Sequence, residues 1–274
     1  MTTRMAALIA ALSVAMVSPA AGWPLPDGGV AQERPSAGEI VAGHLASIGS
    51  PETRSAIRSR LARGTVWFTE AVSGQIRMPG AAELAAAGTK TSVNFEFGQP
   101  AYPGEKLVFD GRDVLVAQIG PGSRSSLGEF LYRQTEVLRD GLLGGTLVTG
   151  WSLLDLKGRR ARVEDAGTER FDDRDLYAVT YVPRRRSGTG EMGIRLYFEP
   201  GTFHHVATVY TVLTRAIQDV EEIVEERFDD FQVVDGLTLP RRWEIRYRKE
   251  PDARPREYRY AVTLTSIVHN TIGQ

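Results

Sequence analysis

The longest apolar-rich stretch of the chain covers residues 126–156, and its apolar positions repeat with the period of an α-helix. Ser126 and Glu129 form a capping box, which predicts a helix start because each side chain can bond a free backbone N–H at that end. Apolar side chains then recur with helical spacing as far as Leu142. We therefore expect an apolar helix in the middle of the chain.

Gly144 and Gly145 predict the end of that helix, because glycine tolerates the left-handed conformation that closes many helices. Thr146 is then expected to cap a second, shorter helix that carries Trp151. Two helices of this kind need a concave apolar surface to lie against.

Two more helices are predicted before this stretch. Ser36 and Glu39 form another capping box, and Gly49 ends the apolar repeat that follows it. Ser50 and Pro51 predict the next start, since proline is favoured in the first helical turn. In that second helix we expect Ile57 and Leu61 to face inward, and most of its arginines to face solvent: Arg54, Arg58, Arg60 and Arg63.

From Gly64 onward the apolar positions alternate with a period of two, which is typical of strands. The predicted strands are residues 65–70, 91–97, 106–110, 113–119, 160–164, 176–182, 194–199, 205–213, 220–231, 239–247 and 257–268. Residues 81–87 are rich in alanine and are expected to form a loose helix or a flexible loop. Strict alternation indicates an antiparallel sheet with one dry face.

About ten strands in one sheet curl strongly, because the twist between neighbouring strands accumulates. The expected fold class is α+β, mainly antiparallel β. It is a strongly curved open sheet, an incomplete barrel, with helices across its concave face. We expect a single half-barrel domain over residues 36–274.

The first residues predict export from the cytoplasm. Arg4 precedes an apolar run over residues 5–17, and small residues follow at 18–20, as in a cleaved signal peptide. We expect a signal peptide over residues 1–22 and a disordered leader over 23–35, which is rich in proline and glycine. No later apolar run reaches membrane-spanning length, so the mature chain is expected to lack a transmembrane anchor and to be periplasmic or secreted.

Composition narrows the functional classes. The chain has 274 residues, a net charge of −1 and no cysteine. The absence of cysteine excludes disulfides, thiolate metal sites and a cysteine nucleophile, and the neutral charge argues against a nucleic-acid partner.

Signals for catalysis are weak. Residues 188–193 match G-x-G-x-x-G, but they lead into a predicted strand and not a helix, so a hairpin turn is expected. Two groups of carboxylates are expected on turns and the solvent face: Asp172, Asp173 and Asp175, and the run Glu221, Glu222, Glu225 and Glu226. His204 and His205 are adjacent on a strand and point to opposite faces, which disfavours a shared metal. We expect no enzyme activity, cofactor or metal, with a hydrolase site scattered over the sheet as a remaining alternative.

Tyrosine and tryptophan gather on one face of the C-terminal strands, and two interpretations remain open. Such a face is ordinary core, or it lines a cavity for an acyl chain with a polar end. The helices of 126–156 likewise either complete the core or form a lid over a lipid-sized cavity. The candidate ligand-binding residues are Phe130, Leu131, Leu138, Leu142 and Trp151 from the helices, with Tyr210, Trp243, Tyr247, Tyr258 and Tyr260 from the sheet.

Several segments together resemble a known family. They are HLASIGSPETRSAIRSRL, GTVWF, YPGEKLVFDGRDV, LGEFLYRQTEVLRDGLLGG, LYFEPGTFHHVATVY and VDGLTLPRRWEIRY. In this order they are similar to bacterial exported proteins grouped with outer-membrane lipoprotein-sorting carriers and related periplasmic lipid-binding proteins. The resemblance implies a curved antiparallel sheet with helices across its mouth and acyl chains held between them. The residues by which the carriers take cargo from an exporter have no match that we can place.

The predicted function is therefore binding or carriage of a lipid, a lipoprotein acyl chain or another amphiphile in a hydrophobic cavity. An envelope protein is a further candidate partner. The alternative is a non-catalytic structural or interaction module of the cell envelope whose half-barrel is filled by its own side chains.

Overall fold

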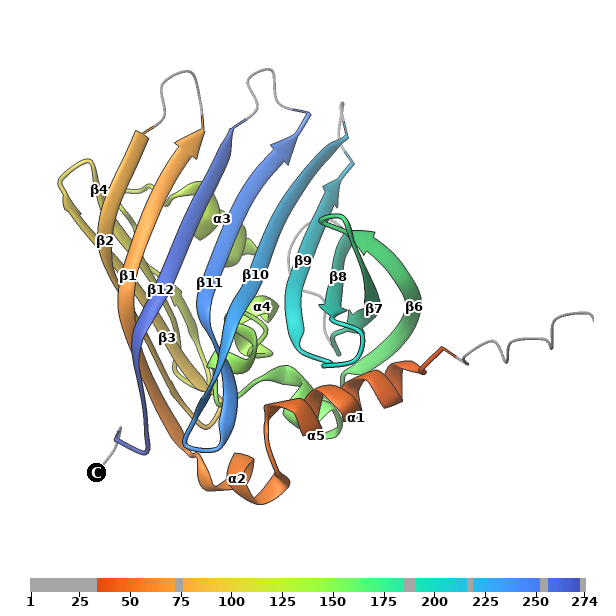
Figure 1. The fold of residues 1–274 in the computed structure, drawn as a ribbon. Helices are drawn as coiled ribbons and strands as arrows, with labels where there is room; N and C mark the ends of the chain where they lie inside the picture. Colours follow the sequence, from red (N-terminus) through yellow and green to blue (C-terminus); the bar gives the residue numbers. More distant parts are fainter. Residues whose placement is uncertain (1–33, 72–75, 185–190, 216–218, 252–255, 272–274) are drawn as a thin grey trace, which may run out of the picture. The chain divides into compact units, whose positions relative to one another are not determined.

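The computed structural model describes residues 34–71, 76–184, 191–215, 219–251 and 256–271 (Figure 1). The predicted signal peptide and nearly all of the predicted leader lie outside these residues, as does the glycine-rich turn at 188–190. These three interpretations stay predictions. Residues Pro35–Gln274 form one compact unit of the chain, which is described below.

Among the described residues, twelve strands form one sheet in the order β5-β4-β3-β2-β1-β12-β11-β10-β9-β8-β7-β6. Every neighbouring pair is antiparallel. The strands are β1 Ser59–Ala71, β2 Ile76–Ala87, β3 Lys90–Gln99, β4 Tyr102–Phe109, β5 Val114–Val116, β6 Arg162–Phe171, β7 Arg174–Val182, β8 Glu191–Phe198, β9 His205–Thr214, β10 Val220–Val234, β11 Leu237–Glu250 and β12 Glu257–His269. Because β5 and β6 are the two edges and do not pair, the sheet is open.

The sheet curves around the middle of the chain, and α3 and α4 lie on its concave side (Figure 1). The helices are α1 Ala37–Ile48, α2 Pro51–Ala56, α3 Ser126–Arg133, α4 Glu136–Arg139 and α5 Leu156–Arg159, with 3-10 turns η1 Gly145–Leu147 and η2 Ser152–Asp155. The predicted fold class, a mainly antiparallel open sheet with helices across its concave face, is confirmed.

The alanine-rich segment is a strand and neither a helix nor a loop. Within β2, Ala82, Leu84 and Ala86 are buried while their neighbours are less so. The strand is hydrogen-bonded to β1 on one side and to β3 on the other. The sequence prediction was wrong because ladder pairing on both sides outweighs the weak strand preference of alanine.

The helix that begins at Pro51 ends at Ala56, earlier than predicted. Arg60 and Arg63 therefore lie on β1, where adjacent side chains point to opposite faces. Arg60 is buried and Leu61 only half-buried, which reverses the orientation expected for both. The error follows from the wrong period: a helical repeat was extended into a strand.

The central stretch is more broken than predicted. Ser125, and not Ser126, is the N-cap of α3, and its hydroxyl accepts the Gly128 N–H at 2.8 Å. The long helix is two short ones, α3 and α4, and the expected second helix is two 3-10 turns followed by α5. Gly144 and Gly145 have positive φ angles, 85° and 51°, but they do not end the helix as predicted, because α4 ends at Arg139 and Gly144 precedes η1.

Candidate functional site

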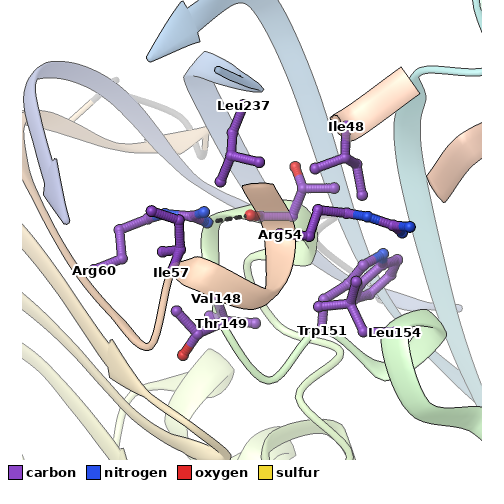
Figure 2. Close-up of a pocket in the computed structure, with 10 residues that line it drawn as sticks. Ile48, Arg54, Ile57, Arg60, Val148, Thr149, Trp151, Leu154 and Leu237 are labelled. Atoms are coloured by element: carbon purple, nitrogen blue, oxygen red, sulfur yellow. Dashed lines mark hydrogen bonds between the residues drawn. The ribbon is translucent and has the colours of Figure 1, made fainter. Parts of the chain in front are cut away.

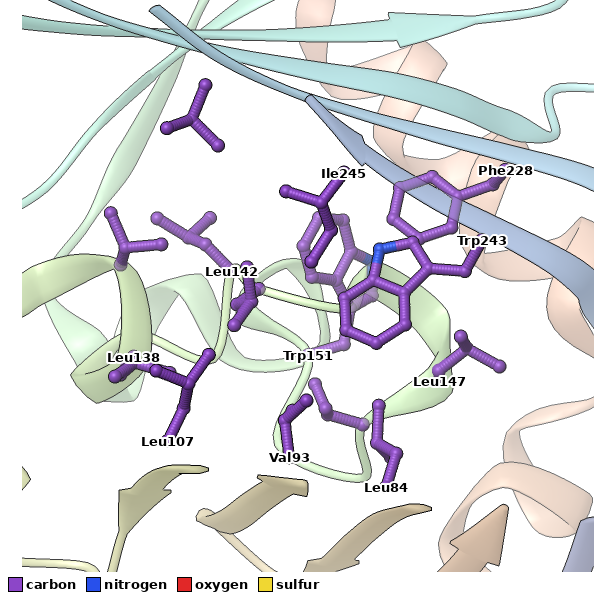
Figure 3. Packing of buried hydrophobic residues seen from close by; sticks show 14 of the residues in the cluster. Leu84, Val93, Leu107, Leu138, Leu142, Leu147, Trp151, Phe228, Trp243 and Ile245 are labelled. Carbon is purple, nitrogen blue, oxygen red and sulfur yellow. The ribbon is translucent and has the colours of Figure 1, made fainter. Parts of the chain in front are cut away.

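The central stretch fills most of the concave face of the sheet. Its apolar side chains are almost fully buried in the main core: Leu127, Phe130, Leu131, Val137, Leu138, Leu142, Leu147 and Trp151. Figure 3 shows Leu138 and Leu142 above Leu107, and Leu147 beside Leu84. We call residues 126–156 the insertion. Most of the surface between insertion and sheet is thus packed protein.

A buried acid fastens the insertion to the middle of the sheet. Glu226 is fully buried on β10 and accepts the Gly144 N–H at 2.8 Å. The Trp243 indole N–H and the Tyr210 hydroxyl also donate to it, at 2.8 and 2.7 Å. Burial raises the pKa of Glu226 to about 7, although the three donors oppose that shift.

A second acid of β10 holds the C-terminal end of α3. Two contacts of 2.8 Å join Arg133 Nη2 to the two carboxylate oxygens of Glu222, and the Tyr247 hydroxyl donates to the same group at 2.7 Å. The expectation that the acidic residues of 220–231 face solvent is wrong for three of them: Glu222, Glu225 and Glu226. Sequence alternation alone does not show that aromatic and arginine side chains donate hydrogen bonds to these carboxylates.

Further polar contacts hold the last part of the insertion. The Arg60 guanidinium donates to the Thr146 carbonyl and, at 3.0 Å, to His269. The Trp151 indole N–H donates to His44 Nε2 at 3.0 Å, while His44 Nδ1 donates to a backbone carbonyl at 3.1 Å. Burial lowers the pKa of His44 to about 3, so this imidazole is neutral.

An open cavity of about 470 Å³ remains at one end of the concave face. It lies where β1 ends, where β12 begins and where α3 starts, and its volume falls within the range typical of small-molecule sites. The lining residues are Phe68, Glu70, Ile76, Met78, Gln99, Ala101, Tyr102, Ile119, Arg124, Ser125, Ser126, Tyr258 and Tyr260. We call this space the end cavity.

The wall of the end cavity includes hydroxyl groups backed by a buried acid. The hydroxyl oxygens of Tyr102 and Tyr260 are 2.7 Å apart, and Tyr260 also donates to Glu105 at 3.0 Å. The Tyr102 and Ser125 hydroxyls are hydrogen-bonded to Glu105 as well. Glu105 is only 2% exposed, and burial raises its pKa.

The contact between Ser125 and Glu105 bears on the hydrolase alternative, which needs a serine beside a base in a cleft. Ser125 is already accounted for as the N-cap of α3. The raised pKa of Glu105 favours its protonated form, which cannot act as a base. This pair therefore gives the hydrolase alternative little support.

A second cavity, lined by Arg54, Arg60 and Trp151 among others, holds only about 30 Å³ (Figure 2). That volume is about the share of a single water molecule, so an acyl chain does not fit there.

The structure separates the ten candidate ligand-binding residues into three groups. Tyr258 and Tyr260 line the end cavity, and Trp151 lines the small one. The other seven pack in the main core and line neither cavity: Phe130, Leu131, Leu138, Leu142, Tyr210, Trp243 and Tyr247. Trp151 and Tyr260 are buried in the same core. That any of the ten contacts a ligand stays a prediction.

Sequence reasoning did not single out most of the cavity wall. Phe68 and Tyr102 lie 34 positions apart and come together because β1 to β4 form a meander, with ring centroids at 4.8 Å. Phe68 is at a buried position of the alternating pattern of β1, so its inward orientation could have been predicted from the sequence. One partner of Glu105, Tyr102, lies three residues away on the same strand, but the other two come from β12 and from the start of α3.

Comparison with known proteins identifies relatives of the fold only. No protein-family model matches the sequence, and no curated protein matches it. A LolA superfamily protein from Nitrosomonas europaea is similar in structure, with a TM-score of 0.47, 16% identity and coverage of 85% of this chain and 93% of the other.

A DUF1329 family protein from Desulfovibrio piger has a TM-score of 0.42 at 10% identity, covering 86% of this chain and 93% of its own. A domain from Vibrio parahaemolyticus, described as an outer membrane lipoprotein-sorting protein, has a TM-score of 0.40 at 10% identity, with coverage of 85% and 95%. None of the helices in the described part of the chain is long and apolar enough to cross a membrane.

Proposed function

We propose that this protein binds a lipid or another amphiphile in the end cavity, as an exported protein of the bacterial periplasm or cell exterior. The observation that carries the proposal is the open cavity of about 470 Å³ left beside an otherwise filled concave face. Its wall joins apolar side chains such as Met78 and Ile119 to the hydroxyls of Tyr102 and Tyr260. An apolar wall with a few convergent polar groups is the usual composition of a ligand site.

Binding would be driven by burial of the apolar part of the ligand. Each methylene removed from water contributes about 0.8 kcal/mol, and the ordering of ligand and protein subtracts from that sum. Phe68 and Tyr258 offer aromatic surface to such a chain, and Ile76 extends the apolar wall to an exposed position, being 49% exposed.

In this proposal the ligand enters without displacing the insertion. Tyr258 and Tyr260 then contact it directly, whereas the seven candidates in the core would reach a ligand only after the insertion left the sheet. The contacts of Glu222, Glu226 and Arg60 with the insertion oppose such a movement. The proposal also keeps a cleaved signal peptide over residues 1–22 and a single ligand-binding domain over residues 36–274.

The experiment is native mass spectrometry of the protein purified from the periplasm of an expressing bacterium, followed by organic extraction of the same sample. We expect an additional mass that is lost on denaturation and recovered in the extract. Protein without any bound mass, which also fails to take up added alkyl amphiphiles, would refute the proposal.

The second candidate function is a structural or interaction module of the envelope with a self-filled half-barrel. The packing of the insertion favours it, because the concave face between β10, β11 and the insertion is closed by side chains. The same experiment separates the two candidates. A module of this kind remains free of amphiphile at every probe concentration and is recovered instead with a protein partner after cross-linking.

A further inference from the structure

The end cavity combines aromatic rings with a buried acid that has no basic partner. Phe68 lies at the centre of the rings, with centroids of Tyr102, Tyr260 and Tyr258 at 4.8, 5.2 and 6.3 Å. All four residues line the cavity. Among the described residues, every hydrogen-bond partner of the Glu105 side chain is a neutral hydroxyl, and no ion pair joins it to a basic group.

Building on the proposed function, we propose that the end cavity selects amphiphiles with a cationic ammonium head. The head lies against the Tyr102 and Tyr260 hydroxyls in front of Glu105, and the tail runs along Met78 and Ile76 toward the opening. Glu70 places a second carboxylate in the same wall.

The physical reason is complementarity of charge. Ammonium groups are attracted to the faces of aromatic rings, which carry negative charge density. A carboxyl buried without a basic partner is costly to ionise, and a cation in the cavity supplies the missing partner. An anionic head in the same place loses its own hydration and shares the wall with the Glu70 carboxylate.

Arg124 is the basic residue in the cavity wall, and its guanidinium is engaged by the protein. It lies 3.7 Å from the ring centroid of Tyr132, and its Nε donates to the Val116 carbonyl at 3.1 Å. Glu129 lies 3.7 Å from the same guanidinium. These contacts hold the charge of Arg124 near neighbours other than Glu105.

The cluster of Tyr102, Tyr260 and Glu105 makes the binding of a cationic head depend on pH. Tyr102, Tyr260 and Glu105 make three mutual contacts. Burial raises the pKa of Glu105, which favours its protonated form in the empty cavity. Arrival of a cation favours the ionised form, and the proton leaves to solvent. Affinity for a cationic head therefore rises as pH increases, whereas affinity for an uncharged head does not. Glu70, Arg124 and Tyr258 are the other titratable groups of the wall.

The test compares three probes with the same dodecyl chain, below their micelle concentrations, on the full exported protein by titration calorimetry. The probes are dodecyltrimethylammonium, the uncharged dodecyl glucoside and dodecanoate. We expect the ammonium probe to bind about tenfold more tightly than dodecanoate, with the uncharged probe between them. Glu105→Gln should remove this preference, and the matched variant Glu83→Gln, at a half-exposed position of β2, which is not adjacent to the β4 strand of Glu105, should keep it.

If Glu105→Gln does not fold, the wild-type protein carries the test through pH. The ammonium probe must bind more tightly as pH rises through the raised pKa of Glu105, with proton release, while the uncharged probe stays constant. Equal or tighter binding of dodecanoate overturns the inference and leaves the proposed function standing. If none of the three chains binds, the proposed function fails as well.

Discussion

The Glu226 carboxyl on β10 accepts the indole N–H of Trp243 on β11 at 2.8 Å, in the interior of the main core. The same oxygen accepts the backbone N–H of Gly144, so one buried acid joins two strands and the insertion. Removing a donor or acceptor from such a cluster leaves its partners buried and unsatisfied, which costs more than the bond itself contributed.

Glu226→Leu should lower the free energy of unfolding by about 1–3 kcal/mol at pH 5, because the apolar side chain accepts from none of the three donors. Urea unfolding followed by circular dichroism measures the change. Asp229→Asn, at an exposed position of the same strand, is the control and should change stability by less than about 0.5 kcal/mol. Equal effects of the two variants would show that Glu226 contributes nothing special.

The same residue makes stability depend on pH. Its pKa in the folded protein, about 7, lies above the ordinary value of 4.5, so the native state binds the proton more tightly than the unfolded state. Its contribution to the free energy of unfolding is complete below pH 4.5. That contribution, on the order of 3 kcal/mol, is lost as pH rises through 7. The difference in unfolding free energy between wild type and Glu226→Leu, which cannot titrate, should shrink between pH 5 and pH 8. A constant difference would contradict the shift.

His44 should act in the opposite direction. Its pKa in the folded protein is about 3, below the ordinary 6.5, so the unfolded state binds the proton more tightly. Its contribution is complete above pH 6.5 and falls with decreasing pH toward 3, by on the order of 4 kcal/mol. His44→Gln, which cannot titrate, should flatten the acid side of the stability profile. His204→Gln, at a half-buried position just before β9, is the control and should leave the acid side of the stability profile steep.

Arg133 and Glu222 give a test of the bond between α3 and β10. Arg133→Met should destabilise the protein by about 1–3 kcal/mol, because Glu222 then keeps only the Tyr247 hydroxyl. The arginine is 30% exposed, so solvent screening lowers the expected loss below that of a fully buried pair. The double variant Arg133→Met with Glu222→Met should recover part of the loss in urea unfolding. A double variant less stable than either single one would refute the pairing.

Truncation should affect stability more than ligand affinity at core residues, and ligand affinity more than stability at cavity residues. Leu138→Ala removes a buried side chain and should lower the unfolding free energy by about 2–5 kcal/mol. Its affinity for an alkyl amphiphile should stay within about twofold of wild type. Tyr258→Ala, at the half-buried edge of the end cavity, should show the reverse order, with weaker binding and a smaller loss of stability. A Leu138→Ala protein that folds well and binds poorly would place the ligand beneath the insertion.

Much of this fold is readable from the sequence because strand alternation is strict. Trp243, Ile245 and Tyr247 share one buried face of β11, as their spacing predicts. The β2 segment was missed because alanine carries little local preference for a strand, and its pairing with β1 and β3 is a long-range property. Gly144 and Gly145 have the left-handed backbone that glycine favours, but the prediction that they end the helix was wrong, since α4 already ends at Arg139.

The candidate site was harder to predict. The insertion covers most of the aromatic faces that indicated a binding surface. Trp243 and Tyr210 therefore pack in the core and donate hydrogen bonds to Glu226. Only the end of the same face, at Tyr258 and Tyr260, meets the end cavity. Periodicity shows which residues face inward. It does not show how far the helices fill the space that those residues enclose.

The central claim is that an amphiphile occupies the end cavity, and a titration of wild type and Ala101→Trp with a fluorescent alkyl probe tests it most directly. Ala101 lines the cavity, and an indole there occupies the space of the chain. The matched control is Val233→Trp at an exposed position of β10, 72% accessible, outside the cavity wall. We predict saturable binding to wild type and Val233→Trp, and at least tenfold weaker binding to a folded Ala101→Trp. Equal binding by all three proteins, or binding by none, would contradict the account.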